Sequence, residues 1–328
     1  MEKYTMNERR NLRFLYGGTV AVLIGLIGLP VSAERILYLD ASAPGEMSDT
    51  EGTFWLDHTA SEYDLIAVGA PAPTHVDNPG EANDYWAFDP NNGFKGIGDE
   101  NLLDFETDVE AGPGLGDPFS LNAYLHWKGP TRGDVPYIIL TKADIKQGSH
   151  PGSGWARPAG RSGFSGYSMN LTWDQENSAS LTMKGGDNAS RHFLRSTTPA
   201  SEGGSLKNRD VMITVTHDGS GSTGGTQIFM NGVQAENLPW AVTDLNTGVD
   251  FVLDESDLAG STLNDDQLEI GANDDYGSGA ANPGNPAGNN NGMNANVYFI
   301  EIYDHALTAE EVVNRWNDGE PQRATVNP

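Results

Sequence analysis

Three stretches of alternating polarity decide the fold of this chain: LNAYLHW at residues 121–127, YSMNLTW at 167–173 and VMITVTH at 211–217. In each stretch every second residue is apolar, so that Leu121 and Leu125, for example, lie on the same face. Successive side chains of a β-strand point to opposite faces of a sheet. This period of two therefore predicts half-buried strands of antiparallel sheets.

Shorter apolar stretches and glycine-rich turns extend the pattern along the chain. Asn231-Gly232 follows an apolar stretch directly and predicts a type I′ hairpin turn, because both central residues of that turn need a positive φ. The further strands that we expect are 36–39, 137–140, 181–184, 227–230, 268–270 and 297–303. Helices do not alternate with these strands, so the chain is predicted to be all-β: a two-sheet antiparallel jelly-roll sandwich.

One helix is predicted, close to the C-terminus. Thr308 and Glu311 have the spacing of a capping box, in which each side chain accepts a hydrogen bond at the start of a helix. Leu307 and Val312 flank the cap as a hydrophobic staple, and Val312 shares a helix face with Trp316. We expect a short helix that packs against the sandwich after its last strand.

Residues 1–33 have the organisation of a signal peptide. Basic residues in 1–13 precede an apolar stretch at 14–30, and the small residues of Val31-Ser32-Ala33 follow it. The alternative is an uncleaved membrane anchor, because a stretch of about 20 apolar residues can span a bilayer. No later segment is apolar enough to do so. The chain is therefore predicted to be exported and to end up secreted or at the cell surface, with no membrane span in its mature part.

Composition sets limits on the partners. The 328 residues include 46 acidic and 19 basic side chains, which give a formal charge of −27. Lys and Arg supply the affinity for nucleic acids, so this charge argues strongly against a nucleic-acid partner. It favours a partner that is cationic, neutral or a divalent metal. The chain has no cysteine, which excludes disulfides, thiolate metal sites and a cysteine nucleophile.

Residues 297–313 resemble the end of LamG-like jelly-roll domains of the concanavalin A-like lectin/glucanase superfamily. Here VYFIEIYDHALTAEEVV runs from a strand ending in Ile-Tyr-Asp into a short helix, as it does in that family. Residues 119–123, 211–232 and 268–271 are similar to further strands of the family and occur in the same order. The resemblance implies two stacked antiparallel sheets, one of them concave, with calcium at the rim and a ligand site on the rim or the concave face.

The resemblance covers roughly residues 34–316. We therefore expect one LamG-like domain there, followed by a polar tail at 317–328. The sequence departs from the family at Phe299, where an acidic residue is common, and at His217, which stands in place of a Tyr. The superfamily includes lectins, adhesion modules and polysaccharide hydrolases, so the fold by itself does not settle the function.

The sequence shows no catalytic motif. Glycan-cleaving enzymes of the superfamily carry acidic residues in an E-x-D-x-E or E-x-D-x-x-E pattern on one strand, which places them within reach of one glycosidic bond. Neither pattern is present. Asp104, Glu106, Asp108 and Glu110 alternate, but four like charges on one face are more typical of a solvated edge. We therefore predict that the protein is not an enzyme.

Calcium is the metal that the sequence favours, since it binds carboxylate and amide oxygens. Asn273, Asp274 and Asp275 follow a predicted strand in a row, and Asp84 and Asp99 lie near other turns. These five residues are the candidate calcium ligands. The alternative is that they are ordinary turn residues, because Asn and Asp are common in turns.

Two long loops, 146–166 and 276–293, carry the candidate ligand-binding residues. Trp155 lies beside Arg157 in the first loop, and Tyr276 opens the second. An aromatic ring next to a hydrogen-bonding side chain suits a sugar. The alternatives are that the loops are disordered insertions and that Trp155 anchors its loop on the sheet.

Three functions remain open at this point. The first is a secreted, non-catalytic binding module for extracellular carbohydrate or a matrix polymer, supported by calcium. The second is a structural or adhesive surface protein that self-associates. The third is a glycan-degrading enzyme whose acidic residues are distant in sequence.

Overall fold

The computed structural model describes most of the chain between residues 34 and 319. The described ranges are 34–42, 53–69, 71–77, 84–90, 92–98, 103, 105, 118–129, 137–145, 164–171, 178–184, 191–197, 201, 204–219, 225–237, 267–271 and 292–319. All elements belong to one compact unit. The predicted signal peptide and most of the polar tail lie outside the described residues.

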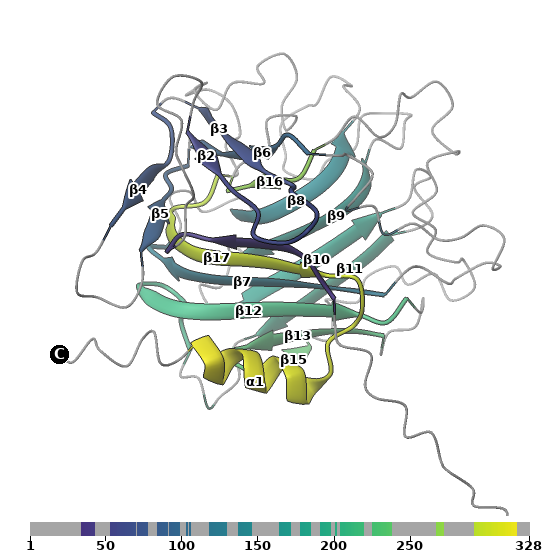
Figure 1. The fold of residues 1–328 in the computed structure, drawn as a ribbon. Coiled ribbons are helices and arrows are strands. Elements are labelled where there is room, and N and C mark those ends of the chain that lie inside the picture. The colour runs from purple at the N-terminus through teal and green to yellow at the C-terminus, as the bar shows by residue number, and fades with distance from the viewer. Residues whose placement is uncertain are drawn as a thin grey trace, which may run out of the picture. The chain divides into compact units, whose positions relative to one another are not determined.

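The first sheet has eight strands and faces the viewer in Figure 1. Its central strands are β7, β12 and β17, all antiparallel to their neighbours. Along the sheet the strands are β14 (Val233–Gln234), β13 (Thr226–Met230), β12 (Arg209–His217), β7 (Phe119–Trp127), β17 (Ala295–Tyr303), β5 (Tyr85–Ala87) and β4 (Thr74–Val76), and β1 (Arg35–Asp40) also pairs with β17.

The second sheet has nine strands and is also antiparallel. In order they are β15 (Glu236–Asn237), β11 (Arg191–Thr197), β10 (Ser178–Lys184), β9 (Phe164–Leu171), β8 (Tyr137–Ile145), β16 (Glu269–Ile270), β6 (Asn92–Gly96), β3 (Leu65–Gly69) and β2 (Phe54–Trp55). Strands distant in sequence are neighbours in both sheets, for example β7 with β17 and β8 with β16. The predicted two-sheet antiparallel sandwich is confirmed.

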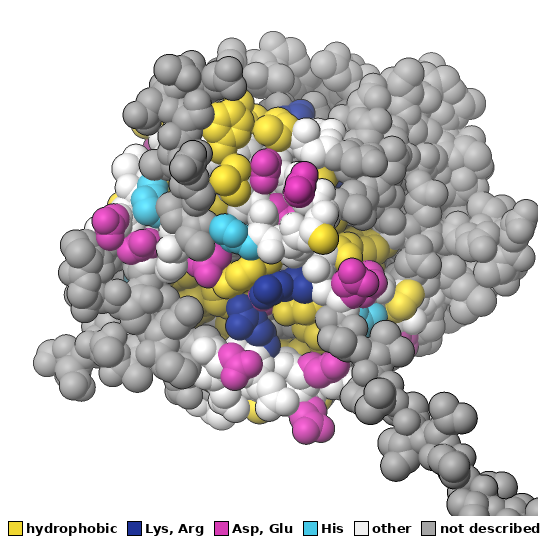
Figure 2. Space-filling view, in the orientation of Figure 1, with side chains coloured by type: hydrophobic (Ala, Val, Ile, Leu, Met, Phe, Trp, Pro, Cys, Tyr) yellow, Lys and Arg dark blue, Asp and Glu magenta, His cyan; other side chains and the backbone are white. Residues whose placement is uncertain are grey.

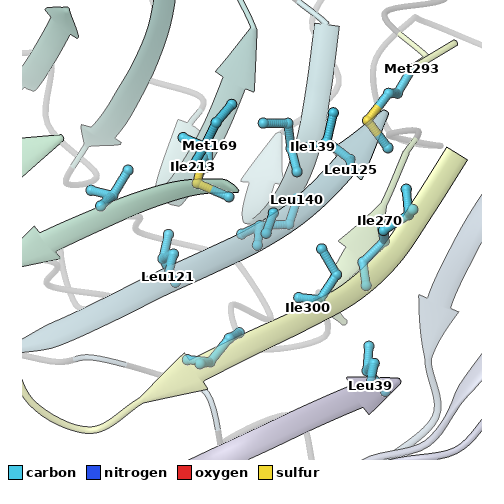
Figure 3. Close-up of a cluster of buried hydrophobic side chains, with 14 of the residues drawn as sticks. Leu39, Leu121, Leu125, Ile139, Leu140, Met169, Ile213, Ile270, Met293 and Ile300 are labelled. Atoms are coloured by element: carbon cyan, nitrogen blue, oxygen red, sulfur yellow. The ribbon is translucent and has the colours of Figure 1, made fainter. Parts of the chain in front are cut away.

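The main core lies between the two sheets (Figure 3). It takes Leu121 and Leu125 from β7, Ile213 from β12 and Met169 from β9, all with no exposed surface. These are the apolar positions of the alternating stretches, so the predicted inward face is confirmed. Fully burying an aliphatic side chain stabilises a fold by about 1.5–3 kcal/mol, and this core supplies most of the driving force for folding.

The prediction that the central strands are half-buried is wrong. β7 is buried on both faces, including Asn122 and Tyr124, whose side chains point away from the sandwich core. A second layer covers this outer face: helix α1 (Ala309–Gly319) packs against it and brings Val312 into a separate hydrophobic cluster. A pattern of period two identifies which residues share a face, but it does not show what covers that face.

Helix α1 begins as predicted. The Glu311 carboxylate accepts a hydrogen bond from the Thr308 backbone N–H at 2.7 Å, and the Glu311 N–H donates to the Thr308 hydroxyl at 3.2 Å. This reciprocal capping box satisfies two N–H groups that a helix start otherwise leaves unpaired. No helix in the described part of the chain is long and apolar enough to cross a membrane.

The predicted hairpin turn is also present and contacts the helix. Asn231 and Gly232 have φ values of 53° and 76°, as a type I′ turn requires. A Cβ atom on Gly232 would lie 3.1 Å from Trp316 Cβ, so glycine also leaves room for the helix. The Asn231 side chain accepts a hydrogen bond from the Met212 N–H at 2.9 Å, which ties the turn to β12.

Candidate functional site

The outer face of the eight-stranded sheet carries an aromatic cluster of its own, separate from the sandwich core. Its members come from five strands and from the C-terminal helix region. They are Tyr124, Met212, Phe229, Phe299, Tyr303, Leu307 and Val312, with Tyr38, Tyr298 and Trp316 packed against them and partly exposed. We call this set the outer aromatic cluster.

A β-bulge in β17 builds the centre of this cluster. Val297 pairs with Leu125 and Phe299 pairs with Tyr124, so Tyr298 is an extra residue on β17. Val297 packs in the sandwich core, whereas Tyr298 and Phe299 both belong to the outer aromatic cluster. A bulge thereby places two successive aromatic side chains on one face, which regular alternation forbids.

Tyr298 joins this aromatic cluster to a carboxylate and an imidazole. Its ring stacks on Tyr124 with centroids 4.7 Å apart, and Tyr85 meets it edge-on at 6.1 Å. Its hydroxyl donates a hydrogen bond to Asp210 Oδ1 at 3.0 Å, and His126 Nδ1 lies 2.8 Å from the same oxygen. We call Tyr85, His126, Asp210 and Tyr298 the Asp210 group.

The Asp210 group combines exposed polar side chains with a partly buried phenol. The Asp210 side chain is 42% exposed and the His126 side chain 31% exposed. Burial of the phenol and the nearby Asp210 carboxylate raise the pKa of Tyr298 above its ordinary value, so this hydroxyl stays protonated and remains a donor. The group thus offers an aromatic ring, a carboxylate and an imidazole on one surface.

A second polar feature crosses the same face of the sheet, four residues along β7 and β12 from the Asp210 group. Thr214, Asn122, Glu301 and Tyr38 are successive register partners on β12, β7, β17 and β1. The Thr214 hydroxyl donates to Asn122 Oδ1 at 2.9 Å, and Asn122 Nδ2 donates to Glu301 Oε2 at 2.8 Å. Side chains of three neighbouring strands thus form a chain of hydrogen bonds that ends at the Glu301 carboxylate.

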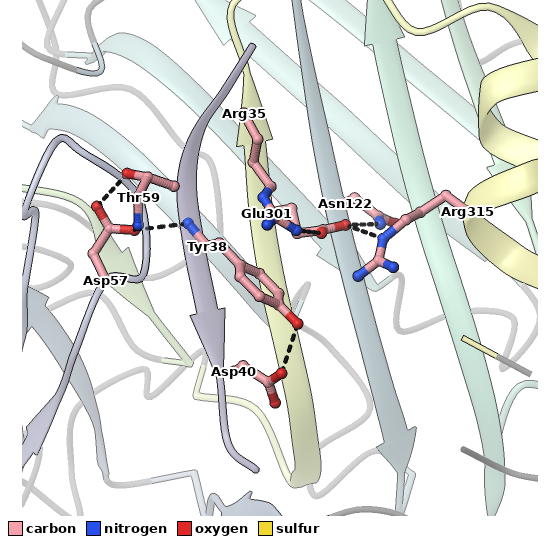
Figure 4. A network of polar contacts seen from close by, with 8 residues as sticks. All are labelled: Arg35, Tyr38, Asp40, Asp57, Thr59, Asn122, Glu301 and Arg315. Carbon is pink, nitrogen blue, oxygen red and sulfur yellow. Dashed lines mark hydrogen bonds and ion pairs between the residues drawn. The ribbon is translucent and has the colours of Figure 1, made fainter. Parts of the chain in front are cut away.

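Glu301 is held by two arginines from opposite ends of the described chain (Figure 4). Arg35 Nη1 lies 2.6 Å from Oε1, and Arg315 Nε lies 2.7 Å from Oε2. The carboxylate has no exposed surface, so its burial requires this pairing. The contacts join β1, β17 and α1 through one charged group.

The two guanidinium groups also lie on aromatic rings. Arg35 Cζ is 3.7 Å from the centroid of Tyr38, and Arg315 Cζ is 4.7 Å from that of Phe299, both within cation–π range. Burial lowers the pKa of Arg315, but Glu301, Tyr303 and Tyr38 together raise it above its ordinary value, so the group stays charged. Figure 2 shows Lys and Arg side chains gathered at one place on this face, bordered by hydrophobic side chains.

Most of the site residues predicted from sequence lie outside the described residues. This holds for the loop residues Trp155, Arg157 and Tyr276 and for the candidate calcium ligands Asp99, Asn273, Asp274 and Asp275. Of the predicted set only Asp84 is described; it is partly buried and directly precedes β5. The described residues contain no group of three or more His, Asp or Glu side chains that could hold a metal ion.

Sequence analysis missed both features of the outer face. Asn122, Tyr124 and His126 are the polar or amphipathic positions of the first alternating stretch, which predicted a solvated face for them. The alternation places them together with Asp210 and Thr214 on one side of the sheet. The pattern could not show the bulge in β17 or the arrival of Arg315 from the helix.

The comparisons with known proteins bear on the fold. No family model matches the chain, and no curated protein does. Among solved structures, the binding domain of Paraclostridial Mosquitocidal Protein 1 is similar at 12% identity and a TM-score of 0.50, covering 87% of this chain and 52% of that one.

Two botulinum structures are similar at 14% identity and cover 87% of this chain and 51% of their own. One belongs to botulinum neurotoxin type C, whose cell entry depends upon interaction with two ganglioside molecules, and has a TM-score of 0.47. The other, a botulinum neurotoxin DC binding domain in complex with rat synaptotagmin II, has one of 0.46. The chain thus spans about half the length of these solved chains. At these identities the likeness concerns the fold alone, and the assignment to LamG-like domains stays a prediction.

Proposed function

We propose that this protein is a secreted, non-catalytic binding module for extracellular carbohydrate, and that the Asp210 group is part of its contact surface. The observation that carries the proposal is the position of the Tyr298 ring. The β17 bulge places this ring on the outer face, beside the exposed Asp210 carboxylate and the His126 imidazole. A sugar ring has an apolar face and a rim of hydroxyls. An aromatic ring next to a carboxylate and an imidazole is complementary to both.

Preorganisation supports the same conclusion. Tyr298 is held by stacking on Tyr124 and by its hydrogen bond to Asp210, so binding need not order this side chain. The loss of rotamer freedom on binding costs about 0.5–1.5 kcal/mol for each flexible side chain, and a fixed ring avoids that cost. The predicted signal peptide at 1–33 and the fold shared with the binding domain of Paraclostridial Mosquitocidal Protein 1 fit an exported binding module.

The test is a glycan array followed by titration calorimetry with the ligand that the array identifies. Asp210→Asn keeps the shape of the side chain but removes its charge, and a charge-assisted hydrogen bond contributes about 1.5–3 kcal/mol. We expect about tenfold weaker binding or more for this variant. Asp218→Asn, an exposed change just beyond the end of β12, is the matched control and should bind as the wild type does.

Two results would contradict the proposal. One is an array on which the wild-type protein retains no glycan at high concentration, with or without EDTA. The other is equal loss of affinity in the Asp210 and Asp218 variants, which would indicate a general effect of charge.

We further propose that calcium supports binding through Asn273, Asp274, Asp275, Asp84 and Asp99. Carboxylate and amide oxygens of this kind suit a hard divalent cation. Calcium at one hundred times its Kd raises the free energy of unfolding by about 2.7 kcal/mol, which a melting curve detects. We expect the melting temperature to rise with millimolar calcium and to fall again with EDTA. An unchanged melting temperature would remove calcium from the proposal.

A further inference from the structure

We propose that Arg35 and Arg315 form a receptor for one anionic group, a carboxylate or a sulfate, on the ligand of this face. The inference rests on the proposed function, because it makes the ligand an acidic carbohydrate. Its basis is a local surplus of positive charge: two guanidinium groups share the single carboxylate of Glu301. Positive charge is scarce in this chain, which has 19 basic and 46 acidic side chains.

Each guanidinium group uses only one of its nitrogen atoms to contact Glu301. Arg35 uses Nη1 for Glu301, and Arg315 uses Nε, and neither has a further hydrogen-bond partner in the described part of the chain. A guanidinium carries five N–H donors, so most of those on each arginine make no hydrogen bond to the described residues. Their planar forks match carboxylate and sulfate oxygens in pairs, which a lysine ammonium cannot do.

The nearest acidic side chain on β1 does not cancel this charge by direct contact. Asp40 Oδ2 accepts the Tyr38 hydroxyl at 2.6 Å, and Oδ1 accepts the Ser42 N–H at 2.8 Å. In Figure 4 Asp40 lies at the hydroxyl end of the Tyr38 ring, whereas Arg35 reaches toward Glu301. Asp40 is therefore engaged with its own strand and turn, and neither guanidinium bonds to it.

The site is both accessible and rigid. The side chains of Arg35 and Arg315 are 35% and 22% exposed, while Glu301 beneath them is fully buried. The rings of Tyr38 and Phe299 support the two guanidinium planes. A ligand anion would thus meet donors that are already oriented and partly desolvated, where charge-assisted hydrogen bonds are strongest.

The test uses the full mature chain and small probes: sodium sulfate, glucuronate and, as the neutral comparison, glucose, at constant ionic strength. Binding is followed by calorimetry or by NMR shifts. Arg35→Gln should weaken sulfate binding about tenfold, since it removes one charged donor. In this variant Glu301 still contacts Arg315 and Asn122, so the fold should persist. Circular dichroism will check this.

A second variant should change the sulfate affinity in the opposite direction. Glu301→Gln removes the shared negative charge and should tighten sulfate binding severalfold. Glu269→Gln is its matched control: Glu269 is also a buried carboxylate near a basic side chain, Lys95, but lies on the nine-stranded sheet. This control should leave sulfate affinity unchanged.

The outcomes separate this inference from the proposed function. If neutral oligosaccharides bind but sulfate and glucuronate do not, the anion receptor is overturned and the carbohydrate module stands. If sulfate binds and responds to the variants while no glycan is retained, the carbohydrate function is overturned and the receptor stands. Equal affinities for wild type, Arg35→Gln and Glu301→Gln, or equal tightening by Glu301→Gln and Glu269→Gln, would also overturn the receptor. Glucuronate without sulfate, or the reverse, identifies which anion is recognised.

Discussion

The two faces of β7 differ although they belong to the same nine residues. On the inner face Leu121, Ala123 and Leu125 pack against the second sheet and carry no charge. On the outer face Asn122 reaches the buried carboxylate and His126 contacts Asp210. The inner face is thus purely apolar, whereas the outer face combines apolar packing around Tyr124 with polar chemistry. The comparison teaches that a change on the inner face should alter stability alone, and a change on the outer face both stability and binding.

The largest loss of stability is expected on the inner face. Leu125→Ala leaves a cavity between the sheets, and such changes cost about 2–5 kcal/mol of unfolding free energy. Leu125 has no exposed surface and lies between Val211 and Val297. Urea denaturation measures the loss, which should be about 3 kcal/mol, with ligand affinity unchanged where the variant is folded. A loss below that of Thr308→Ala would contradict the assignment of the main core.

The Glu301 ion pairs of the outer face should contribute less to stability than the main core, but their loss should still be measurable. Glu301→Ala removes the carboxylate between Arg35 and Arg315, and breaking a buried pair costs about 3–5 kcal/mol when both partners are buried. Both arginines are partly exposed, so we expect about 2 kcal/mol by urea denaturation. Glu301→Gln, which keeps the shape, should lose less. Equal stability of the alanine variant and the wild type would show that the pairing does not hold α1 and β1 to the sheet.

Alkaline pH should weaken the outer face. Burial and the neighbouring Glu301 raise the pKa of Tyr303, so its folded-state pKa exceeds the unfolded value of about 10. Its contribution is complete below about pH 10 and is lost as pH rises toward the folded-state pKa, at a slope of about 1.4 kcal/mol per pH unit.

Urea denaturation between pH 8 and pH 11 measures this slope. Tyr303→Phe should reduce it without abolishing it, because burial also raises the pKa values of Tyr38 and Tyr298. Identical slopes for the variant and the wild type would contradict the burial of the Tyr303 hydroxyl.

The smallest expected effect is at the helix start. Thr308→Ala removes the side chain that caps α1, and such a loss costs about 1 kcal/mol. Thr308→Ser keeps the hydroxyl and is the control. Since α1 brings Arg315 to Glu301, the alanine variant should also weaken anion binding slightly. A stable variant with a normal melting temperature would mean that α1 is held by packing alone.

The described residues show how far sequence patterns reach. The strands at 121–127 and 211–217, the Asn231-Gly232 turn and the capping box at Thr308 are local signals, and these elements were confirmed. Short strands such as β6 (Asn92–Gly96) were missed, because a five-residue stretch with two glycines shows no alternation. The predicted loop and calcium residues were identified by composition alone and, apart from Asp84, lie outside the described residues.

By itself the sequence determined which residues share a face, because a strand's period of two is a property of the backbone and holds wherever the strand lies. It also determined where the helix begins, since a cap is completed within a few residues. Only the tertiary structure decided that Arg35 and Arg315, at opposite ends of the described chain, share Glu301. It also decided that a bulge adds Tyr298 to the outer face. These contacts depend on register between strands distant in sequence, and no local pattern specifies that register.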